Sequence, residues 1–183
     1  MAITREEARE ILDSMMETPA LRAHVRSVEI VMEAYADKFG EDPERWAVTG
    51  LLHDADYEKW PEEHPKRIVT LLEERGETEI AHAINCHFTR WGFTCESPLD
   101  KALLACDELT GLIIAVARLR PNLLQDLTPK SVKKKLKDKA FARGVDRDEV
   151  IIGVELLGVD LTEHIGFIIE ALRPHQDQVI VAK

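Results

Sequence analysis

The most apolar segment of the chain is LDKALLACDELTGLIIAVARL, residues 99–119, which is followed closely by Pro121. Its apolar residues recur at helical spacing over more than five turns, so we expect a long helix at the centre of the fold. Asp107 lies within it, on the same face as Leu103 and Ile114. A buried carboxylate without a partner costs several kcal/mol, so Asp107 calls for an arginine, a lysine or a metal ion.

Helix signals also recur on both sides of this segment, and no long alternation of apolar and polar residues predicts a strand. Capping residues and Pro or Gly boundaries favour an all-α fold with helices over about residues 4–16, 19–39, 43–53, 65–75, 78–88, 99–119 and 129–143. Asp146 with Glu149, and Asp160 with Glu163, introduce two further short helices, in which each Asp caps the helix and the Glu reaches back. The tail after Pro174 is either disordered or packs at an edge.

Two of these helices carry histidines where a core is expected. In the second helix His24 shares a stripe with Val28, Val31 and Tyr35 at spacing i, i+4, i+7 and i+11. His53 shares a face of the third helix with Trp46, and Asp54 follows it directly. A neighbouring His and Asp at the end of a helix can converge on one cation.

The composition limits the classes of function. The chain has 183 residues and a formal charge of −10, which argues against broad binding of nucleic acid or of an anionic membrane. The longest apolar run, residues 112–117, falls far short of the roughly 20 needed to cross a bilayer. The first residues do not form a secretory signal, and three unpaired cysteines suit a reducing compartment. We therefore expect a cytoplasmic protein.

The spacing of His24, the His53-Asp54 pair in GLLHD and Asp107 in ACDEL resembles the H…HD…D signature of the HD-domain superfamily of metal-dependent phosphohydrolases, of the HDIG type. The resemblance covers residues 21–114. It implies an HD-domain-like helical bundle with extra C-terminal helices. We expect one domain over residues 1–183, with a metal-site core at about 18–120 and a helical extension at about 128–173.

The resemblance also implies a metal centre. His24, His53, Asp54 and Asp107 would hold one ion. Members with two metals carry two further histidines, whose places are filled here by His64 and His87, and Asp54 would bridge to that second ion. Imidazole and carboxylate ligands suit Mn, Fe, Co, Ni or Zn. Asp54 and Asp107 are then the catalytic carboxylates of a site at which a metal-activated hydroxide attacks phosphorus.

The chain departs from the family pattern in one respect. Members with HDIGK have a phosphate-contacting Lys where this chain has Tyr57, and Lys59 is a candidate substitute. His82 is a rival to His87 as a ligand. His164 and His175 lie outside the matched region and are interpreted as structural or exposed.

A basic segment stands out in this acidic chain. Residues 128–143 hold seven basic residues against Asp138, a net local charge of +6. A solvated helix face is one interpretation, and a phosphate clamp that includes Lys133 and Lys134 is another. Lys66 and Arg67 lie at a predicted helix N-terminus, where anions bind, and are independent candidates for substrate contact.

The leading hypothesis is a metal-dependent phosphohydrolase acting on a nucleotide or other small phosphoester. Two alternatives remain open: a di-iron HD-type oxygenase, and a catalytically silent domain that senses a nucleotide. The expected partner is a small phosphorylated substrate, without membrane or broad nucleic-acid binding, and the sequence leaves homo-oligomerisation open.

Overall fold

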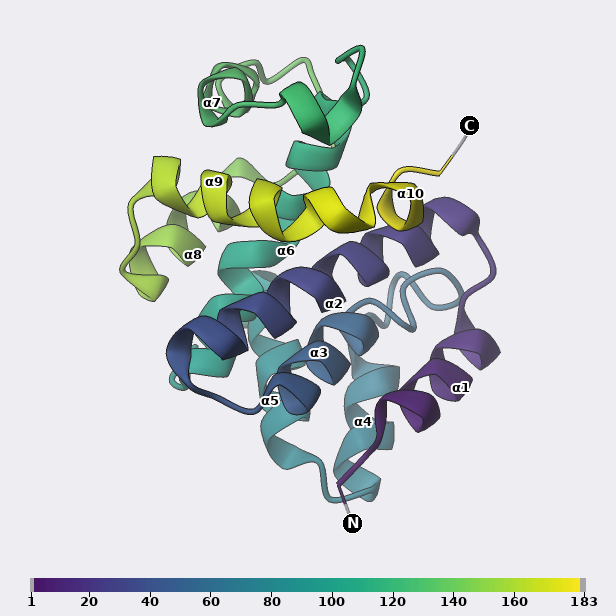
Figure 1. The fold of residues 1–183 in the computed structure, drawn as a ribbon. Helices are drawn as coiled ribbons and strands as arrows, with labels where there is room; N and C mark the ends of the chain where they lie inside the picture. Colours follow the sequence, from purple (N-terminus) through teal and green to yellow (C-terminus); the bar gives the residue numbers. More distant parts are fainter. Residues whose placement is uncertain (1, 182–183) are drawn as a thin grey trace.

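The computed structural model describes residues 2–181, which fold entirely into helices and connecting loops (Figure 1). The α-helices are α1 (Arg5–Met15), α2 (Pro19–Phe39), α3 (Pro43–Leu52), α4 (Lys66–Glu74), α5 (Thr78–His87), α6 (Pro98–Ala117), α7 (Pro129–Leu136), α8 (Arg147–Leu157), α9 (Leu161–Leu172) and α10 (Gln176–Val179). Short 3₁₀ turns span Thr89–Trp91, Leu123–Asp126 and Arg173–His175. The all-α prediction is confirmed, and the helices from α1 to α6 begin and end close to the predicted residues.

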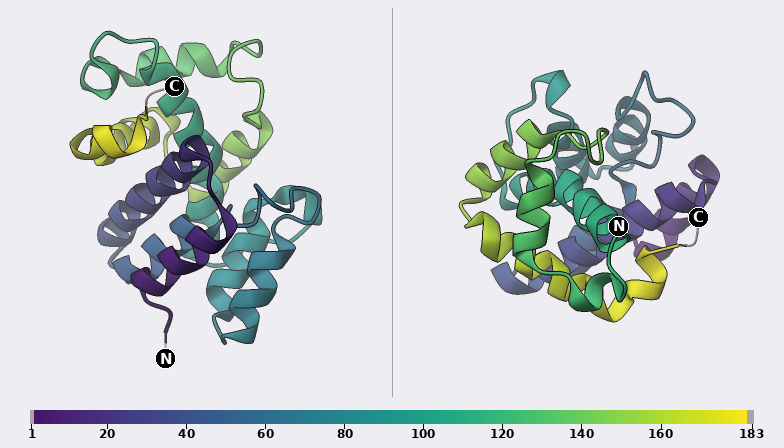
Figure 2. Two further views of the ribbon diagram at one scale, coloured as in Figure 1. Left: turned by 90° about the vertical axis from the view of Figure 1, so that its right-hand side faces the viewer. Right: turned by 90° about the horizontal axis from the view of Figure 1, so that it is seen from above.

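The helix α6 is the central element, as its apolar sequence predicts. It packs against α2, α5, α8 and α9, so most of its circumference is buried (Figures 1 and 2). One glycine allows α8 to come close: a Cβ at Gly153 would lie 2.6 Å from the Cα of Ala105. The position of α8 therefore depends on the absence of a side chain at this point.

The pair α2 and α3 forms the second layer, on which the N-terminal helix α1 packs. A Cβ at Gly50 would lie 2.8 Å from the carbonyl oxygen of Val28, so the two helix backbones are in direct contact there. This close approach brings the C-terminal end of α3 beside the first half of α2. His53, at the end of α3, is thereby placed against His24 of α2, with ring centroids 5.3 Å apart.

The lysine-rich segment differs from its prediction. Its helix, α7, ends at Leu136 rather than at Gly144. The reason is Arg147, whose guanidinium donates hydrogen bonds to backbone carbonyls along the segment that follows α7; these belong to Leu136, Asp138, Phe141, Ala142 and Val145. These hydrogen bonds draw the carbonyls toward Arg147 and away from the direction of a helix axis. Residues 137–146 therefore form a loop, in which Ala142 has a positive φ of 46°.

The C-terminal helices close the bundle. Asp146 and Asp160 cap α8 and α9 by accepting hydrogen bonds from backbone N–H groups, as predicted. Glu149 does not reach back to its cap; its Oε1 accepts from the backbone N–H and the hydroxyl of Thr89. The tail packs at an edge, since Val179 of α10 is buried against α2. Within the described residues, no helix has the length and hydropathy that a membrane span requires.

Candidate metal centre

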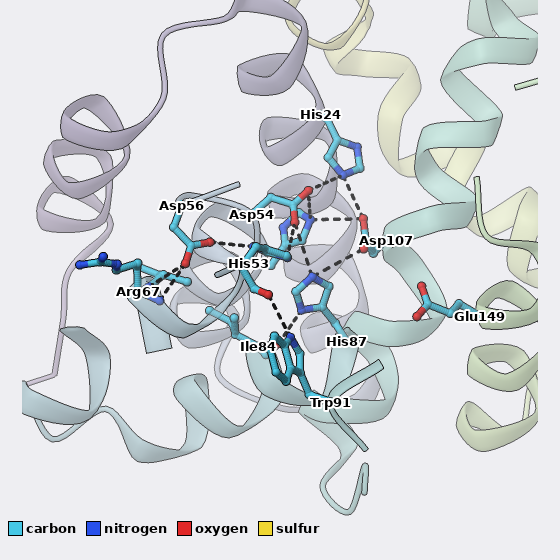
Figure 3. A network of polar contacts seen from close by, with 12 residues as sticks. His24, His53, Asp54, Asp56, Arg67, Ile84, His87, Trp91, Asp107 and Glu149 are labelled. Atoms are coloured by element: carbon cyan, nitrogen blue, oxygen red, sulfur yellow. Dashed lines mark hydrogen bonds and ion pairs between the residues drawn. The ribbon is translucent and has the colours of Figure 1, made fainter. Parts of the chain in front are cut away.

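Six side chains predicted as metal ligands converge on one point between α2, α3, α5 and α6 (Figure 3). They arrive from separate parts of the fold: α2 supplies His24, the end of α3 supplies His53 and then Asp54, the turn before α4 supplies His64, the last position of α5 supplies His87, and the middle of α6 supplies Asp107. Only tertiary packing brings them together, because His24 and Asp107 are 83 residues apart in the sequence.

The first group surrounds one oxygen of Asp107. His24 Nε2 lies 2.9 Å from Asp107 Oδ1, and His53 Nε2 lies 3.2 Å from the same atom. Oδ2 of Asp54 is 3.6 Å from His24 Nε2 and 3.4 Å from His53 Nε2. Four potential ligand atoms therefore enclose one small volume.

The second group uses the other oxygen of Asp54. Oδ1 lies 3.3 Å from Nε2 of His64 and 3.5 Å from Nε2 of His87. Asp54 thus presents one oxygen to each group, which is the arrangement that a bridging carboxylate requires. The two groups are adjacent, since His87 Nε2 is also 4.0 Å from Asp107 Oδ2.

The orientation of three imidazoles suits a bound cation. Nδ1 of His53 lies 2.7 Å from the carbonyl oxygen of Gly50, and Nδ1 of His87 lies 2.5 Å from that of Ile84. A carbonyl can only accept, so each Nδ1 carries a proton and Nε2 is the nitrogen that each ring turns toward the carboxylates. Nε2 of His53 is buried without a hydrogen-bond partner. A nitrogen turned toward carboxylate oxygens needs a positive charge between them, which a proton supplies in the metal-free protein and which a bound metal ion would replace.

His64 is held in the same way by a residue that the sequence analysis did not select. Asp56 Oδ1 accepts from His64 Nδ1 at 2.7 Å, and its Oδ2 accepts from the backbone N–H groups of Arg67 (2.9 Å) and Ile68 (3.1 Å) at the start of α4. Asp56 is fully buried. It therefore orients a candidate ligand and also caps a helix. Carboxylates often orient metal-bound histidines by such a hydrogen bond. The available signal was a carboxylate only two residues after Asp54, a predicted ligand.

No ordinary ion pair with a lysine or arginine balances the negative charges of the carboxylates at the centre, within the part of the chain that the structure describes. Within residues 2–181, no lysine or arginine pairs with Asp54 or Asp107. Burial alone would raise the pKa of Asp54, but the neighbouring imidazoles outweigh it and hold that pKa well below its usual range. In return, and against burial, Asp54 and Asp107 raise the pKa of His53 well above its usual value. The two carboxylates are thus anionic and attract positive charge.

The centre opens into a cavity of about 950 Å³. Five of the six predicted ligands line it, all except the fully buried His53, and Tyr57 also lines it with its ring edge-on to His64. The loop after α7 forms another side and contributes Lys139 and Arg143, while Arg90 comes from the 3₁₀ turn Thr89–Trp91. Within the described chain, these three basic side chains form no ion pair with a carboxylate, so they are available to an anionic ligand.

Acidic side chains also line this cavity. Glu108 follows Asp107 on α6, and burial together with the charge of Asp107 raises the pKa of Glu108 to about 8. Glu149 is buried and, as Figure 3 shows, projects from α8 on the side of Asp107 away from Asp56. Neither glutamate could be predicted as a site residue from the sequence, because their common location depends on the packing of α8 against α6.

Three residues predicted from the sequence to contact the substrate do not line the cavity: Lys59, Lys66 and Arg67. Lys59 donates a hydrogen bond to the carbonyl of Ser14 at 2.7 Å. Arg67 pairs with Glu63 on the exposed side of α4, away from the ligands (Figure 3). The ammonium of Lys66 lies 3.8 Å above the ring of Trp91.

The lysines of α7 are likewise not among the residues that line the cavity. Lys133 donates to the hydroxyl of Thr162 on α9 at 2.8 Å, and Lys134 is exposed. The physical reason is the early end of α7, which places the later loop residues Lys139 and Arg143, rather than the helix, over the cavity.

The remaining histidines lie apart from this centre. His82, the predicted rival of His87, faces Asp100 and Cys86 instead. His164 is buried and structural: its Nε2 donates to the carbonyl of Ala105 at 2.8 Å, so its Nδ1 accepts from the hydroxyl of Tyr35 at 2.5 Å. His175 is half-buried in the last 3₁₀ turn.

Comparison with known proteins gives one positive result. A family model described as "HD domain" matches residues 21–117, more than half of the 183 residues. The matched segment includes all six predicted ligands and ends at the last residue of α6. Neither the curated proteins nor the solved structures contain a match to this chain.

Proposed function

The chain belongs to the HD-domain family, and on that premise we propose that it is a metal-dependent phosphohydrolase acting on a nucleotide or other small phosphoester. The family is one of metal-dependent hydrolases, and the His/Asp clusters of this chain are compatible with metal binding. The substrate and the reaction are proposals for this member.

The observation that carries the proposal is the direction in which the imidazole Nε2 atoms point. His53, His64 and His87 each use Nδ1 to hold a backbone or carboxylate oxygen, and each turns Nε2 toward Asp54 or Asp107. The donor set fits divalent metal ions. We propose that His24, His53, Asp54 and Asp107 hold one ion, and that Asp54, His64 and His87 hold a second.

Nitrogen and carboxylate ligands without thiolate suit Mn, Fe, Co, Ni or Zn. Bound divalent ions supply Lewis-acid catalysis, because they lower the pKa of water and neutralise charge on phosphate oxygens. The chain's own groups position these events: Asp56 orients His64, the carbonyls of Gly50 and Ile84 orient His53 and His87, and Asp54 and Asp107 provide the negative charge that retains the ions.

The walls of the cavity favour a small anionic substrate. Arg90, Lys139 and Arg143 can contact phosphate oxygens, while Glu108 and Glu149 can accept hydrogen bonds from hydroxyl or amino groups of the rest of the substrate. A volume of about 950 Å³ accommodates a nucleotide-sized molecule. The overall charge of −10 does not oppose this, because the positive groups are local to the cavity.

We also propose that residues 1–183 act as one domain, in which the extension at 128–173 completes the site. The support is that α8 packs closely on α6 and that the loop before α8 lines the cavity. The three cysteines are free thiols, which supports the proposed cytoplasmic location.

The test is a screen of phosphorylated metabolites against protein loaded separately with Mn, Co, Ni, Fe or Zn. Phosphate release with at least one metal is expected, and Asp54→Ala should remove both ions and lower the rate by at least about 1000-fold, since Lewis-acid catalysis contributes several kcal/mol. Full hydrolysis by Asp54→Ala would contradict the proposal. Tight binding of a nucleotide without turnover at any metal loading would indicate a sensor instead.

A di-iron oxygenase is the second candidate. Tyr57 favours it because this residue replaces the lysine that contacts phosphate in phosphohydrolases of the HDIGK type. Tyr57 lines the cavity at the position where HDIGK members carry a phosphate-contacting Lys. Anaerobic purification followed by iron analysis and a measurement of oxygen consumption separates the two functions. Substrate-dependent oxygen uptake with no phosphate release would favour the oxygenase.

A further inference from the structure

A second cluster of side chains that could hold a metal ion lies between α5 and the start of α6 and shares no residue with the first. His82 and Cys86 are one helical turn apart on α5, and Asp100 lies in the first turn of α6. Nδ1 of His82 is 3.0 Å from Asp100 Oδ2 and 3.6 Å from Cys86 Sγ. Cys95, in the loop between the two helices, brings its Sγ to 3.8 Å from the carbonyl oxygen of Cys86. The imidazole of His82, the thiol of Cys86 and a carboxylate oxygen of Asp100 therefore lie within 4.8 Å of one another, and Cys95 lies beside them in the neighbouring loop.

The separations of these atoms suit a tetrahedral ion. With Zn–S near 2.3 Å and Zn–N near 2.0–2.1 Å, two ligands of a tetrahedral zinc lie about 3.6 Å apart when one is sulfur and one is nitrogen. The distance between Cys86 Sγ and His82 Nδ1 has this value. The shorter distance from His82 to Asp100 is that of a direct hydrogen bond, and a shift of about 0.4 Å opens it to the separation that two zinc ligands require.

The surroundings allow both retention and access. Cys86 and Asp100 are almost completely buried, whereas the side chain of His82 is 42% exposed and offers a route for an ion from solvent. Asp100 Oδ2 is already held by the backbone N–H groups of Glu96 and Ser97, so it is fixed in position before any ion binds. A pre-positioned carboxylate reduces the entropy lost on binding.

We propose that His82, Cys86 and Asp100 form a structural zinc site, separate from the candidate hydrolytic centre, and that Cys95 moves in from the neighbouring loop as its fourth ligand. Thiolates select a soft ion such as Zn²⁺, whereas the hydrolytic centre offers only nitrogen and oxygen donors. Each thiol loses its proton to solvent when it binds. The ion joins the C-terminal half of α5 to the loop at 92–97 and to the start of α6, and it thereby steadies His87, the residue after Cys86.

Cobalt substitution tests this proposal independently of any enzymatic activity. Protein kept under reducing conditions is loaded with Co²⁺, and the near-ultraviolet charge-transfer band of thiolate-bound cobalt is recorded. The wild type should show the band, Cys86→Ala should lose it, and Cys95→Ala should retain at most half of its intensity. Zinc titration against a chromophoric chelator should show one fewer tightly bound zinc per chain in both variants than in the wild type.

Two further variants separate this site from the hydrolytic centre. Cys106→Ala removes the third thiol, which lies in α6 beside Asp107, and should keep the band. Asp54→Asn disrupts the hydrolytic centre and should also keep it. Absence of the band in folded wild type, its survival in Cys86→Ala, or its loss in Cys106→Ala would overturn the proposal. Circular dichroism of each variant confirms that it is folded.

Discussion

Asp56 accepts a hydrogen bond from Nδ1 of His64 at 2.7 Å, while its second oxygen caps the start of α4. The relationship ties a candidate ligand of the second metal to the backbone of a helix. It does not involve the first group of ligands, which are held by α2, α3 and α6. The two proposed ions should therefore respond differently when Asp56 is changed.

Asp56→Asn is expected to weaken the second ion selectively. The amide oxygen can serve either His64 or the N–H groups of α4, and the amide nitrogen cannot accept from Nδ1. Loss of such an orienting carboxylate lowers metal affinity by about 10–100-fold. Metal analysis after dialysis against graded chelator should show one ion lost and one retained. Asp160→Asn, which changes the cap of α9 in the same way, should retain both, and equal weakening of both ions by Asp56→Asn would contradict the assignment.

The loop lysine and arginine, rather than the helix lysines, should bind substrate. Removal of a charge-assisted hydrogen bond costs about 1.5–3 kcal/mol, so Lys139→Ala and Arg143→Ala should each weaken substrate binding about 10–100-fold. Lys133→Ala and Lys134→Ala remove the same charge outside the cavity lining and serve as controls. Steady-state kinetics with the best substrate of the screen measures KM for each. A rise in KM confined to the two α7 variants would favour the prediction that Lys133 and Lys134 contact substrate.

Arg147 should govern the order of the same loop. Its guanidinium binds five backbone carbonyls, which the single ammonium of a lysine cannot do. We expect Arg147→Lys to speed tryptic cleavage after Lys137, Lys139 or Arg143 and to raise KM. Arg118→Lys, a change of the same kind outside the loop, should leave the cleavage rate unchanged. Equal protection of the loop in Arg147→Lys and wild type would argue against this role.

Gly153 should be intolerant of a methyl group. Its Cβ would lie 2.6 Å from Ala105 Cα and 2.8 Å from Ala105 N, both backbone atoms that cannot turn aside. Gly153→Ala should lower the free energy of unfolding by roughly 1–3 kcal/mol, as overpacking does. Gly144→Ala is the matched control, because a Cβ there meets no atom within 4 Å. Urea denaturation of both variants makes the comparison, and an unchanged midpoint for Gly153→Ala would show that α8 can move.

His164 should make stability depend on pH in the acidic range. Burial lowers the pKa of His164, so the unfolded chain takes up a proton at a higher pH than the folded chain does. The stability that the buried neutral His164 contributes is complete above the pKa of about 6.5 in the unfolded chain. It is lost as the pH falls through the lower pKa of His164 in the folded protein. Urea denaturation at pH 7.5 and 5.5 should show a smaller loss of stability on acidification for His164→Gln than for wild type. Parallel losses in the two proteins would exclude His164 as the source.

Much of the fold could be predicted from local pattern. Helix boundaries at α2 and α6 follow from Pro, Gly and capping residues, which act within a few residues of themselves. The lysine-rich segment shows the limit of such reasoning. Its charge pattern is compatible with a helix to Gly144, but Arg147 binds the carbonyls of the segment and ends the helix at Leu136. No local feature of residues 137–144 predicts that Arg147 competes with the helical hydrogen bonds for these carbonyls.

The sequence alone determined the class of fold and nominated the six ligands. His24, His53 and Asp107 interrupt apolar helix faces, where buried polar groups need partners, and the resemblance to the HD-domain signature implied His64 and His87. Only the tertiary structure decided how those ligands divide between the two oxygens of Asp54, since the division depends on where four helices cross. It also decided which basic residues face the cavity. The helix lysines point elsewhere, and a loop held by the carbonyl contacts of Arg147 carries Lys139 and Arg143 to the site.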